Sequence, residues 1–293
     1  GKVVLAFFKR CGSMGQILKS AMEEFIQSRQ NPRVKSLMKL RDRAERRRLG
    51  LFAVEGLREL SRCVELSDVE EIYYCPEFFK GRGHAEFVEK VAAGKKIPLC
   101  RLSSGAFEKV SNREGCDGLI GVARQWGCSI SDIALPSDRP ATVLVADAIE
   151  KPGNLGALVR TADSEGADAL VLTNLVCDIF NPAAVRASQG ALFSVQIASA
   201  SAEDAARWLK SNGIKPVGAH LGAEKSLWEA DLSGPVAIVV GSESDGLGAD
   251  WEAELAEKVK IPMGGISDSL NVNVAASIFL YESLRQKNAR SAR

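Results

Sequence analysis

The chain has 293 residues, of which 46% are hydrophobic and 26% charged, the composition of a soluble globular protein with one large domain or two. No run approaches the roughly 18 apolar residues that a membrane helix needs, and the apolar residues 3–8 are too few for a secretory signal. Seven cysteines without a Cys-x-x-Cys pair and two isolated histidines argue against a disulfide framework and a metal centre. We expect reduced thiols, no metal, no membrane and a cytoplasmic location, with a chloroplast or mitochondrion as the alternative.

The net charge of +1 hides an asymmetry between the two halves of the chain. Residues 1–140 carry 25 lysines and arginines against 18 acidic residues, and residues 141–293 carry 13 against 19. Nine basic and two acidic residues fall within 29–48. Such a block is typical of a protein that binds a polyanion; a solvated helix face or an organelle-targeting segment are the alternatives. The candidates for polyanion contacts are Arg33, Lys35, Lys39, Arg41 and Arg43.

The first half alternates between strand and helix patterns after an extension at residues 1–30 that is part helical at 16–27. A basic helix is expected from Asn31 to about Arg48. Strands are then expected at 51–55, 69–74, 98–102 and 119–123, and helices at 59–64, 85–92 and 105–110. This alternation predicts a small α/β domain over residues 31–125. Residues 126–140 contain prolines and lose periodicity, so they are the expected linker.

The second half, residues 141–293, is expected to be a second α/β domain. Its strands are continuous apolar runs, expected at 142–146, 169–172, 216–219, 237–240 and 259–261. Its helices are expected at 155–165, 182–188, 202–211, 250–256 and 270–287. Continuous apolar strands are typical of a parallel sheet that helices cover on both faces.

A first polar corner follows the strand at 142–146. There Asn154 is expected to cap the next helix, and Gly156 to keep its first turn open. Polar groups at a strand-to-helix corner are how α/β proteins build ligand sites.

The same helix carries Arg160, six residues past Asn154. An arginine near a helix N-terminus opposes the helix dipole, so an anionic ligand such as a phosphate is its expected compensation. The alternative is a surface arginine paired with Glu150 or Asp163.

A second corner reads Ile238-Val-Val-Gly-Ser-Glu-Ser-Asp-Gly-Leu247, in which Gly241 ends an apolar strand. Glycine at a strand's carboxyl end lets a ligand approach bare backbone. A phosphate-binding loop is disfavoured, because the segment is acidic and has no Gly-x-x-x-x-Gly-Lys. The alternative is an acidic surface turn.

A third corner runs from Ile261 through a Gly-Gly turn to the last helix. Its start holds more polar groups than capping requires, namely Ser267, Asp268, Ser269 and Asn271. These groups indicate a ligand site; taken alone, the segment could also be a well-capped helix.

The three corners, in this order, resemble the three motifs of the SpoU (TrmH-like) class of SPOUT RNA ribose 2′-O-methyltransferases. The likeness covers residues 141–287, and residues 181–193 also resemble that family. Residues 31–123 are similar to the ribosomal-protein-like substrate-binding domain that often precedes it. The chain departs from the family at Glu150-Lys151, where Asn or Asp is common, and at Asn273, where a small residue is common.

The resemblance implies a knotted (trefoil) parallel-sheet domain that binds S-adenosylmethionine and pairs with a second copy as a homodimer. It implies that Arg160 is catalytic, arranged with the ribose by Asn154, Glu243, Ser269 and Asn271. It also implies that the cofactor is held by Gly241, Ile261, Met263, Ser269 and Leu270.

The expected function is therefore S-adenosylmethionine-dependent RNA 2′-O-ribose methylation, with large-subunit ribosomal RNA favoured by the accessory domain. A tRNA methyltransferase and a non-catalytic RNA-binding protein of the same fold are the alternatives. A nicotinamide-dependent oxidoreductase is disfavoured, because no strand is followed by Gly-x-Gly-x-x-Gly.

Overall fold

The computed structural model describes residues 24–94, 97–127, 129–242, 244, 246–266 and 269–291. The chain divides into two compact units. The N-terminal unit holds the described residues up to Ser61 together with Asp68–Arg124, and the C-terminal unit holds Arg62–Ser67 and the chain from Gln125 onward. None of the helices in these ranges combines the length and apolar character that crossing a membrane requires.

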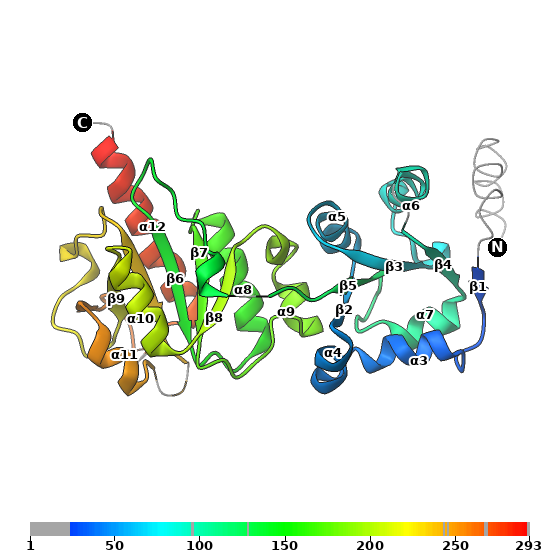
Figure 1. The fold of residues 1–293 in the computed structure, drawn as a ribbon, viewed down its shortest axis with the longest axis horizontal. Coiled ribbons are helices and arrows are strands. Elements are labelled where there is room, and N and C mark those ends of the chain that lie inside the picture. Colours follow the sequence, from blue (N-terminus) through cyan, green and yellow to red (C-terminus); the bar gives the residue numbers. More distant parts are fainter. Residues whose placement is uncertain are drawn as a thin grey trace. The chain divides into compact units, whose positions relative to one another are not determined.

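The N-terminal unit is built on a mixed five-stranded sheet of order β1-β4-β3-β5-β2 (Figure 1). Its strands are β1 (Glu24–Ile26), β2 (Leu51–Glu55), β3 (Val69–Tyr74), β4 (Leu99–Leu102) and β5 (Leu119–Arg124). Strands β1, β4 and β3 run parallel, whereas β5 is antiparallel to both β3 and β2. Its helices are α3 (Pro32–Lys39), α4 (Arg43–Leu49), α6 (Arg82–Gly94) and α7 (Ser104–Val110), with the short turn η1 (Pro76–Phe78). Helix α5 (Leu57–Leu66) begins in this unit, and its residues from Arg62 onward are grouped with the other unit.

The basic segment forms two helices where the sequence predicted one. Helix α3 ends at Lys39, and Asp42 begins α4 by accepting a hydrogen bond from the Glu45 amide at 3.0 Å. An aspartate cap starts a new helix because it satisfies amides that the first turn leaves unpaired. The predicted helix at 16–27 is wrong at its end, since Glu24–Ile26 is a strand paired with β4. The earlier part of that prediction lies outside the described residues.

The C-terminal unit contains a six-stranded sheet of order β11-β9-β10-β6-β7-β8 in which every neighbouring pair is parallel. Its strands are β6 (Thr142–Asp147), β7 (Ala169–Thr173), β8 (Ile197–Ala200), β9 (Lys215–Ala219), β10 (Val236–Val240) and β11 (Glu257–Val259). The expected parallel α/β sheet is thereby confirmed. The sequence did not predict β8, a four-residue edge strand that buries only its first two residues.

Helices cover both faces of this parallel sheet (Figure 1). The helices are α8 (Pro152–Ser164), α9 (Pro182–Ala187), α10 (Ala202–Ser211), α11 (Ala249–Glu254) and α12 (Val272–Ser291), with short turns η2 (Ile130–Asp132), η3 (Ala191–Phe193) and η4 (Leu227–Glu229). Helices α10 and α11 share one apolar cluster with the sheet. Helices α8 and α12 contact each other and the sheet, and α9 packs on α8. Burial on both sides explains why β6, β7 and β10 are apolar throughout.

The strand order reverses between β6 and β10. The chain leaves β6 toward β7 on one side, and it leaves β10 toward β11 on the other side, beyond β9. Ala146 and Val240 are neighbours in the register, so the segments that follow these two strands begin side by side. Open parallel sheets bind ligands at such a switch point, outside the carboxyl ends of the strands.

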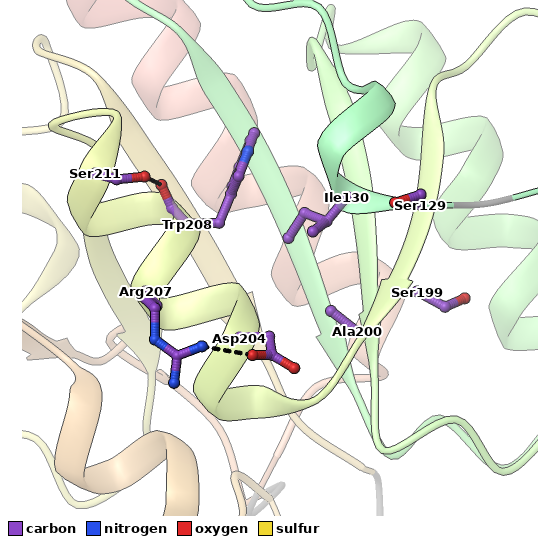
Figure 2. Close-up of a pocket in the computed structure, with 8 residues that line it drawn as sticks. All are labelled: Ser129, Ile130, Ser199, Ala200, Asp204, Arg207, Trp208 and Ser211. Carbon is purple, nitrogen blue, oxygen red and sulfur yellow. Dashed lines mark hydrogen bonds and ion pairs between the residues drawn. The ribbon is translucent and has the colours of Figure 1, made fainter.

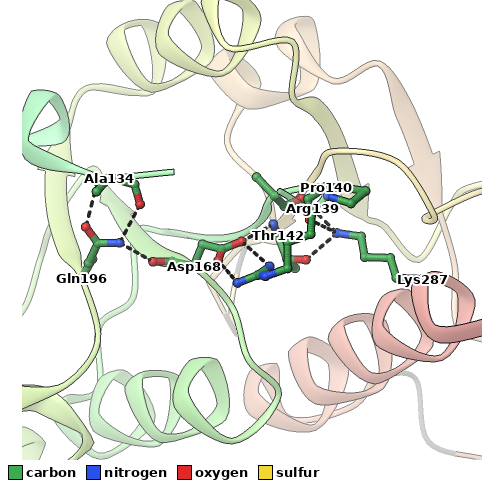
Figure 3. Close-up of polar contacts among 8 residues, drawn as sticks. Ala134, Arg139, Pro140, Thr142, Asp168, Gln196 and Lys287 are labelled. Atoms are coloured by element: carbon green, nitrogen blue, oxygen red, sulfur yellow. Dashed lines mark hydrogen bonds and ion pairs between the residues drawn. The ribbon is translucent and has the colours of Figure 1, made fainter. Parts of the chain in front are cut away.

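The amino edge of the same sheet carries a closed polar network (Figure 3). The Lys287 ammonium of α12 donates to three oxygens, those of Pro140 (3.2 Å), Ala141 (2.9 Å) and the Thr142 hydroxyl (2.5 Å). Asp168 accepts from the Thr142 amide at 2.7 Å and pairs with Arg139. Burial lowers the pKa of Lys287 to about 8, although the Asp168 carboxylate acts in the opposite direction.

The segment expected as a linker, residues 126–140, packs on the C-terminal unit. Ile130, Ile133 and Leu135 lie against the apolar cluster that α10 and α11 share with the sheet. Ala134 exchanges two hydrogen bonds with the Gln196 side chain, at 2.8 and 2.9 Å. Apart from Cys128, which lies outside the described residues, the segment is therefore part of this unit's packing.

Candidate active site

Three asparagines from distant parts of the chain meet at the carboxyl edge of the parallel sheet. The Asn154 Oδ1 of α8 accepts from the Asn273 Nδ2 of α12 at 3.3 Å and from the Asn271 Nδ2 at 3.5 Å. The Asn271 Oδ1 accepts from the backbone amide of Asn273 at 3.0 Å and from its Nδ2 at 3.2 Å. We call these residues the asparagine cluster. It joins the first and third predicted corners.

The sequence predicted that Asn154 caps α8, and this prediction is wrong. The helix begins at Pro152, and the residue before it, Lys151, makes no side-chain capping bond. Proline is favoured at the first helical position because its ring presets φ and its missing N–H would be unpaired there anyway. Asn154 is thus the third residue of the helix, and its amide oxygen faces α12.

Arg160 lies on α8 two turns beyond Pro152, and its side chain is exposed. Within the described ranges it makes no hydrogen bond or ion pair, so the alternative of a paired surface arginine is not observed. Asp163, one of the two carboxylates considered, instead accepts from the Ser194 hydroxyl at 2.9 Å. A guanidinium stays charged and offers five N–H donors in a fixed plane. Arg160 can therefore receive an anion.

Gly156 has a different role from the one predicted. A Cβ at this position would overlap the carbonyl oxygen of Ala184 and crowd the side chain of Ala187, both on α9. The glycine thus lets α8 and α9 pack backbone to backbone, rather than opening the first turn. Helix α9 is itself capped by Asn181, whose Oδ1 accepts from the Ala183 amide at 2.9 Å. The segment 181–193 therefore packs against α8 through α9 and η3.

The second corner closes on itself. Ser242 and Gly246 exchange backbone hydrogen bonds of 2.9 and 3.1 Å. A Cβ at Gly241 would overlap the backbone of Gly246 and Leu247, so the loop's own turn requires this glycine. Glu243, predicted to arrange the reacting groups, lies outside the described residues.

The third corner presents apolar side chains to solvent. Met263 is 37% exposed and Ile266 fully exposed, while Ile261 and Leu270 are half-buried. Ser269 is exposed, and Ser267 and Asp268 lie outside the described residues. Exposed apolar side chains that gather at one place mark a binding surface.

The sequence analysis missed Leu221, which is 65% exposed in the segment after β9. Its neighbour His220 donates its backbone amide to the Val259 oxygen at 2.9 Å, which sets Leu221 beside the start of the third corner. The available signal was an apolar residue directly after a strand end, in Ala219-His-Leu-Gly.

The predicted polyanion contacts of the N-terminal unit differ in their surroundings. Arg33 pairs with Glu24 and Glu71, and Arg41 donates to three carbonyl oxygens at the end of α7. Arg43 is half-buried. Lys35 and Lys39 are exposed, and neither has a bonded partner in the part of the chain that the structure describes. These two lysines are the best placed of the five to receive a phosphate.

A hollow at the β8 edge of the C-terminal unit is remote in sheet order from the motif strands β10 and β11 (Figure 2). It is lined by Ser129, Ile130, Ser199, Ala200, Asp204, Arg207, Trp208 and Ser211. Its single cation, Arg207, pairs with Glu203 and Asp204, so the hollow has no charge to offer an anion. None of the predicted site residues lines it.

The described ranges hold no group of three or more histidine, cysteine or acidic side chains that is arranged to bind a metal. Cys63, Cys75, Cys100, Cys116 and Cys177 are free thiols. Burial raises the pKa of both Cys63 and Cys75 to about 12, so these two are unreactive at neutral pH.

Both units match known families. Residues 141–281 match the SpoU rRNA methylase family, and residues 31–121 match the MRM3-like substrate-binding domain. The chain is 30% identical over 262 residues to the 23S rRNA (guanosine(2553)-2′-O)-methyltransferase RlmP of Bacillus subtilis, a match that covers 87% of this chain and 97% of the relative. It is 34% identical over 223 residues to the 23S rRNA (guanosine-2′-O-)-methyltransferase RlmB of Ralstonia nicotianae, covering 75% and 89%.

Two solved structures are similar over nearly their whole length. An RNA 2′-O ribose methyltransferase superposes with a TM-score of 0.76 at 35% identity, covering 90% of this chain and 99% of that one. An AdoMet-bound rRNA methyltransferase from Sinorhizobium meliloti superposes with a TM-score of 0.79 at 28% identity, covering 89% and 97%.

Proposed function

We propose, from the premise that the chain belongs to the SpoU rRNA methylase family, that it transfers a methyl group from S-adenosylmethionine to a ribose 2′-hydroxyl of large-subunit ribosomal RNA. The observation that carries the proposal is the asparagine cluster, in which Asn271 is bonded to Asn154, 117 residues earlier, and Asn154 lies on the same helix as Arg160. The relatives named as 23S rRNA 2′-O-methyltransferases favour ribosomal RNA over tRNA.

The carboxyl edge suits S-adenosylmethionine. We propose that Ile261, Met263, Leu270 and Leu221 form an apolar wall for an adenine and a methionyl chain, with Gly241 and Ser269 beside it; Met263 and Leu221 are exposed, and Ile261 and Leu270 are half-buried. Bound there, S-adenosylmethionine would supply a methyl group on a positively charged sulfur, open to attack by an oxygen. The side chains on this wall are uncharged, so they would not repel that sulfonium.

Arg160 acts on the RNA side of the reaction. Its guanidinium stays protonated, so it does not serve as a base. Instead it grips a phosphate next to the target ribose and stabilises the negative charge that grows on the 2′-oxygen. Holding the ribose in one orientation lowers the barrier further, because the attacking oxygen must lie in line with the bond that breaks.

The amides of the asparagine cluster orient the ribose. Asn273 donates to both Asn154 and Asn271, which fixes the side to which each of those amides presents its oxygen. We assign Asn154 and Asn271 to hydrogen bonds with the ribose. Ser269 and Glu243 are assigned to the same task of orienting the ribose, as the family resemblance implies. Asn273 then fills a supporting position behind these two amides.

The N-terminal unit is proposed to hold the RNA. Lys35 and Lys39 can neutralise phosphates, with Arg43 beside them at the start of α4. Arg33 and Arg41 contribute by fixing helix α3 and the end of α7. Few aromatic residues accompany these cations, so we expect contacts to the RNA backbone rather than base stacking.

Helix α12 supports the proposal of a homodimer. Val274, Ile278, Tyr281 and Leu284 are all between 37% and 61% exposed and recur at helical spacing. A second copy of this chain would cover the stripe. We also propose the trefoil knot of the family, with the third corner and α12 passing through the preceding loop; the return of the chain from the edge strand β11 to Asn154 is in keeping with it.

The domain limits that we propose are 31–125 for the RNA-holding part and 141–293 for the methyltransferase. Residues 126–140 would act as a fixed connection on the latter. The free thiols support a reducing compartment, the cytoplasm or an organelle.

The decisive experiment maps 2′-O-methyl marks on ribosomal RNA and tRNA incubated with the purified protein and S-adenosylmethionine. A new mark on large-subunit ribosomal RNA is expected, together with calorimetric binding of S-adenosylmethionine. Marks on tRNA alone would shift the substrate to the alternative. Cofactor binding without any mark would indicate a non-catalytic RNA-binding protein, and no cofactor binding would refute the proposal.

A further inference from the structure

A buried carboxylate stands at the switch point of the parallel sheet. Asp147 is the last residue of β6 and only 1% exposed. Its register partner on β7 is Thr173, and on its other side β6 adjoins β10, whose end leads into the second corner. Neither the expected catalytic group nor the expected cofactor wall includes this residue.

In the part of the chain that the structure describes, every hydrogen-bond donor to Asp147 is neutral. Its Oδ1 accepts from the Thr173 hydroxyl at 2.8 Å and from the Asn174 side-chain amide at 2.9 Å. Its Oδ2 accepts from the backbone amide of Gly248 at 3.3 Å, 101 residues away. Among the described residues no cation pairs with it. Burying a carboxylate without a cation is costly, so its hydrogen bonds must hold it firmly.

The backbone around Asp147 is strained. Ala148 and Asn174, which directly follow β6 and β7, have φ values of 51° and 48°. Residues other than glycine rarely adopt this left-handed region, and they keep it only where their surroundings enforce it. Here the Ala148 amide donates to the Thr173 oxygen at 2.9 Å, and the Asn174 side chain is bonded to Asp147. The carboxylate thus holds the turn after β7, and a backbone hydrogen bond ties the turn after β6 to the same strand end.

The network continues into the helix after the second corner. The Trp251 indole of α11 is fully buried, and its Nε1 donates to the Thr173 hydroxyl at 2.9 Å. Gly248 is the residue directly before α11. The Asp147 carboxylate therefore contacts the Gly248 backbone directly, whereas Thr173 anchors helix α11 through the Trp251 indole.

We propose that Asp147 is a positioning residue for cofactor binding. Its contact with Gly248, the residue directly after the second corner, holds the end of that corner against the start of the first, so that the backbone after β10 has one fixed distance from the backbone after β6. The inference rests on the proposed function, because it assigns the carboxylate to the S-adenosylmethionine site. Asp147 acts through the Gly248 backbone and does not touch the reacting atoms.

The variant Asp147→Asn tests this role with little change in shape. An amide has one acceptor oxygen instead of two, so its NH2 group must face either the Gly248 amide or the donors on β7. In either orientation the side chain loses a hydrogen bond, either the one with the Gly248 amide or one with a donor on the β7 side. The matched control is Thr173→Val, which removes the hydroxyl shared by Asp147 and Trp251 but leaves the Gly248 contact in place.

We expect Asp147→Asn to raise both the calorimetric Kd and the KM for S-adenosylmethionine at least tenfold, with kcat at saturating cofactor within threefold of wild type. Thr173→Val should lower the melting temperature by a similar amount and leave the Kd within threefold. All measurements are made at a temperature at which every variant is folded. Equal Kd values for the two variants at equal loss of stability would overturn the proposal and reduce Asp147 to a structural residue.

A second variant decides the question if Asp147→Asn does not fold. Gly248→Ala keeps the carboxylate and all of its donors, but its Cβ would lie 3.3 Å from the Asp147 Oδ2 and displace the contact slightly. We expect a three- to tenfold weaker Kd for S-adenosylmethionine with an unchanged melting temperature; wild-type affinity would contradict the proposal. If the wild-type protein itself does not bind S-adenosylmethionine, the proposed function fails rather than this inference.

Discussion

The two edges of the parallel sheet in the C-terminal unit are built in opposite ways. At the amino edge the Lys287 ammonium has three oxygen acceptors (Figure 3). Asp168 accepts from the Thr142 amide through its carboxylate and from the Gln196 side chain through its backbone oxygen. At the carboxyl edge Ile266 is fully exposed, and Arg160, on the helix that starts at this edge, makes no hydrogen bond or ion pair with the described residues. At the amino edge the polar side chains are paired within the chain itself. At the carboxyl edge, and on the helix that starts there, hydrogen-bond donors and apolar side chains remain open to a ligand.

Backbone strain divides in the same way. The described residues include three non-glycine positions with positive φ, Ala148, Asn174 and Gln189. The first two directly follow strands at the carboxyl edge, and the third follows α9, which packs on the helix that carries Arg160. Strained conformations persist where the surroundings enforce them, and they gather at functional sites. If the proposed function holds, the groups that stabilise the sheet and the groups that serve the reaction lie at opposite ends of the same strands.

The largest effect is expected from Arg160→Ala. Loss of the guanidinium should lower kcat for RNA methylation by about 10²–10³-fold, because a positioned donor to a developing oxyanion contributes that much. The free energy of unfolding should change by less than about 0.5 kcal/mol, since the side chain is exposed and unpaired. Single-turnover methylation and thermal unfolding measure the two quantities.

The matched control for Arg160→Ala is Arg207→Ala, an exposed arginine on α10 that pairs with Glu203 and Asp204. This control should retain full activity. A variant at position 160 that keeps wild-type kcat, or that loses cofactor affinity more than threefold, would remove the contrast between the edges.

At the amino edge, Lys287→Met should act on stability alone. Three oxygens would lose their donor, two of them backbone carbonyls, which costs about 2 kcal/mol of unfolding free energy. Activity per folded molecule should stay within twofold of wild type. Chemical denaturation and initial rates test this prediction, and a large loss of kcat in folded protein would show that the edges are coupled.

A smaller effect is expected from Asn273→Ala in the asparagine cluster. The change removes the donor that Asn154 and Asn271 share, so kcat should fall about three- to tenfold, in line with one or two neutral hydrogen bonds. Asn288→Ala, an exposed position on the same helix, is the control. Equal rates for the two variants would show that Asn273 merely fills space.

The smallest expected effect is a pH dependence of the Lys287 contribution. The folded-state pKa of about 8 lies below the ordinary value of 10.5, so the unfolded chain binds more protons between these two values. Stability contributed by this group therefore rises as pH increases from 8 to 10.5. The difference between wild type and Lys287→Met should grow by about 1 kcal/mol over that window, allowing for partial solvent screening. A flat difference would mean that the three acceptors keep the ammonium charged.

The strands of the C-terminal unit were predictable because they are long apolar runs; β6, β7 and β10 lie within one residue of their expected bounds. β8 was not, because Ser199 and Ala200 at its end are not buried and the edge position needs only one paired side. The break between α3 and α4 depends on a local signal, the capping residue Asp42 followed by Glu45. The prediction missed it because the whole segment was read as one basic helix.

The site was predictable in its residues but not in its contacts. The resemblance named Asn154 and Asn271 together, and their hydrogen bond could not follow from spacing alone. Gly156 and Gly241 were recognised as special, yet a sequence does not say which neighbour approaches a glycine; here the neighbours are α9 and the loop's own turn. Asp147 was missed because one acidic residue at a strand end is common on a protein surface.

Helix α12 spans the distance between the two edges, with Asn271 at its start and Lys287 near its end, about 24 Å along the axis. Because one continuous helix carries both ends, a proline placed in its middle should disturb the asparagine cluster and the Lys287 contacts together.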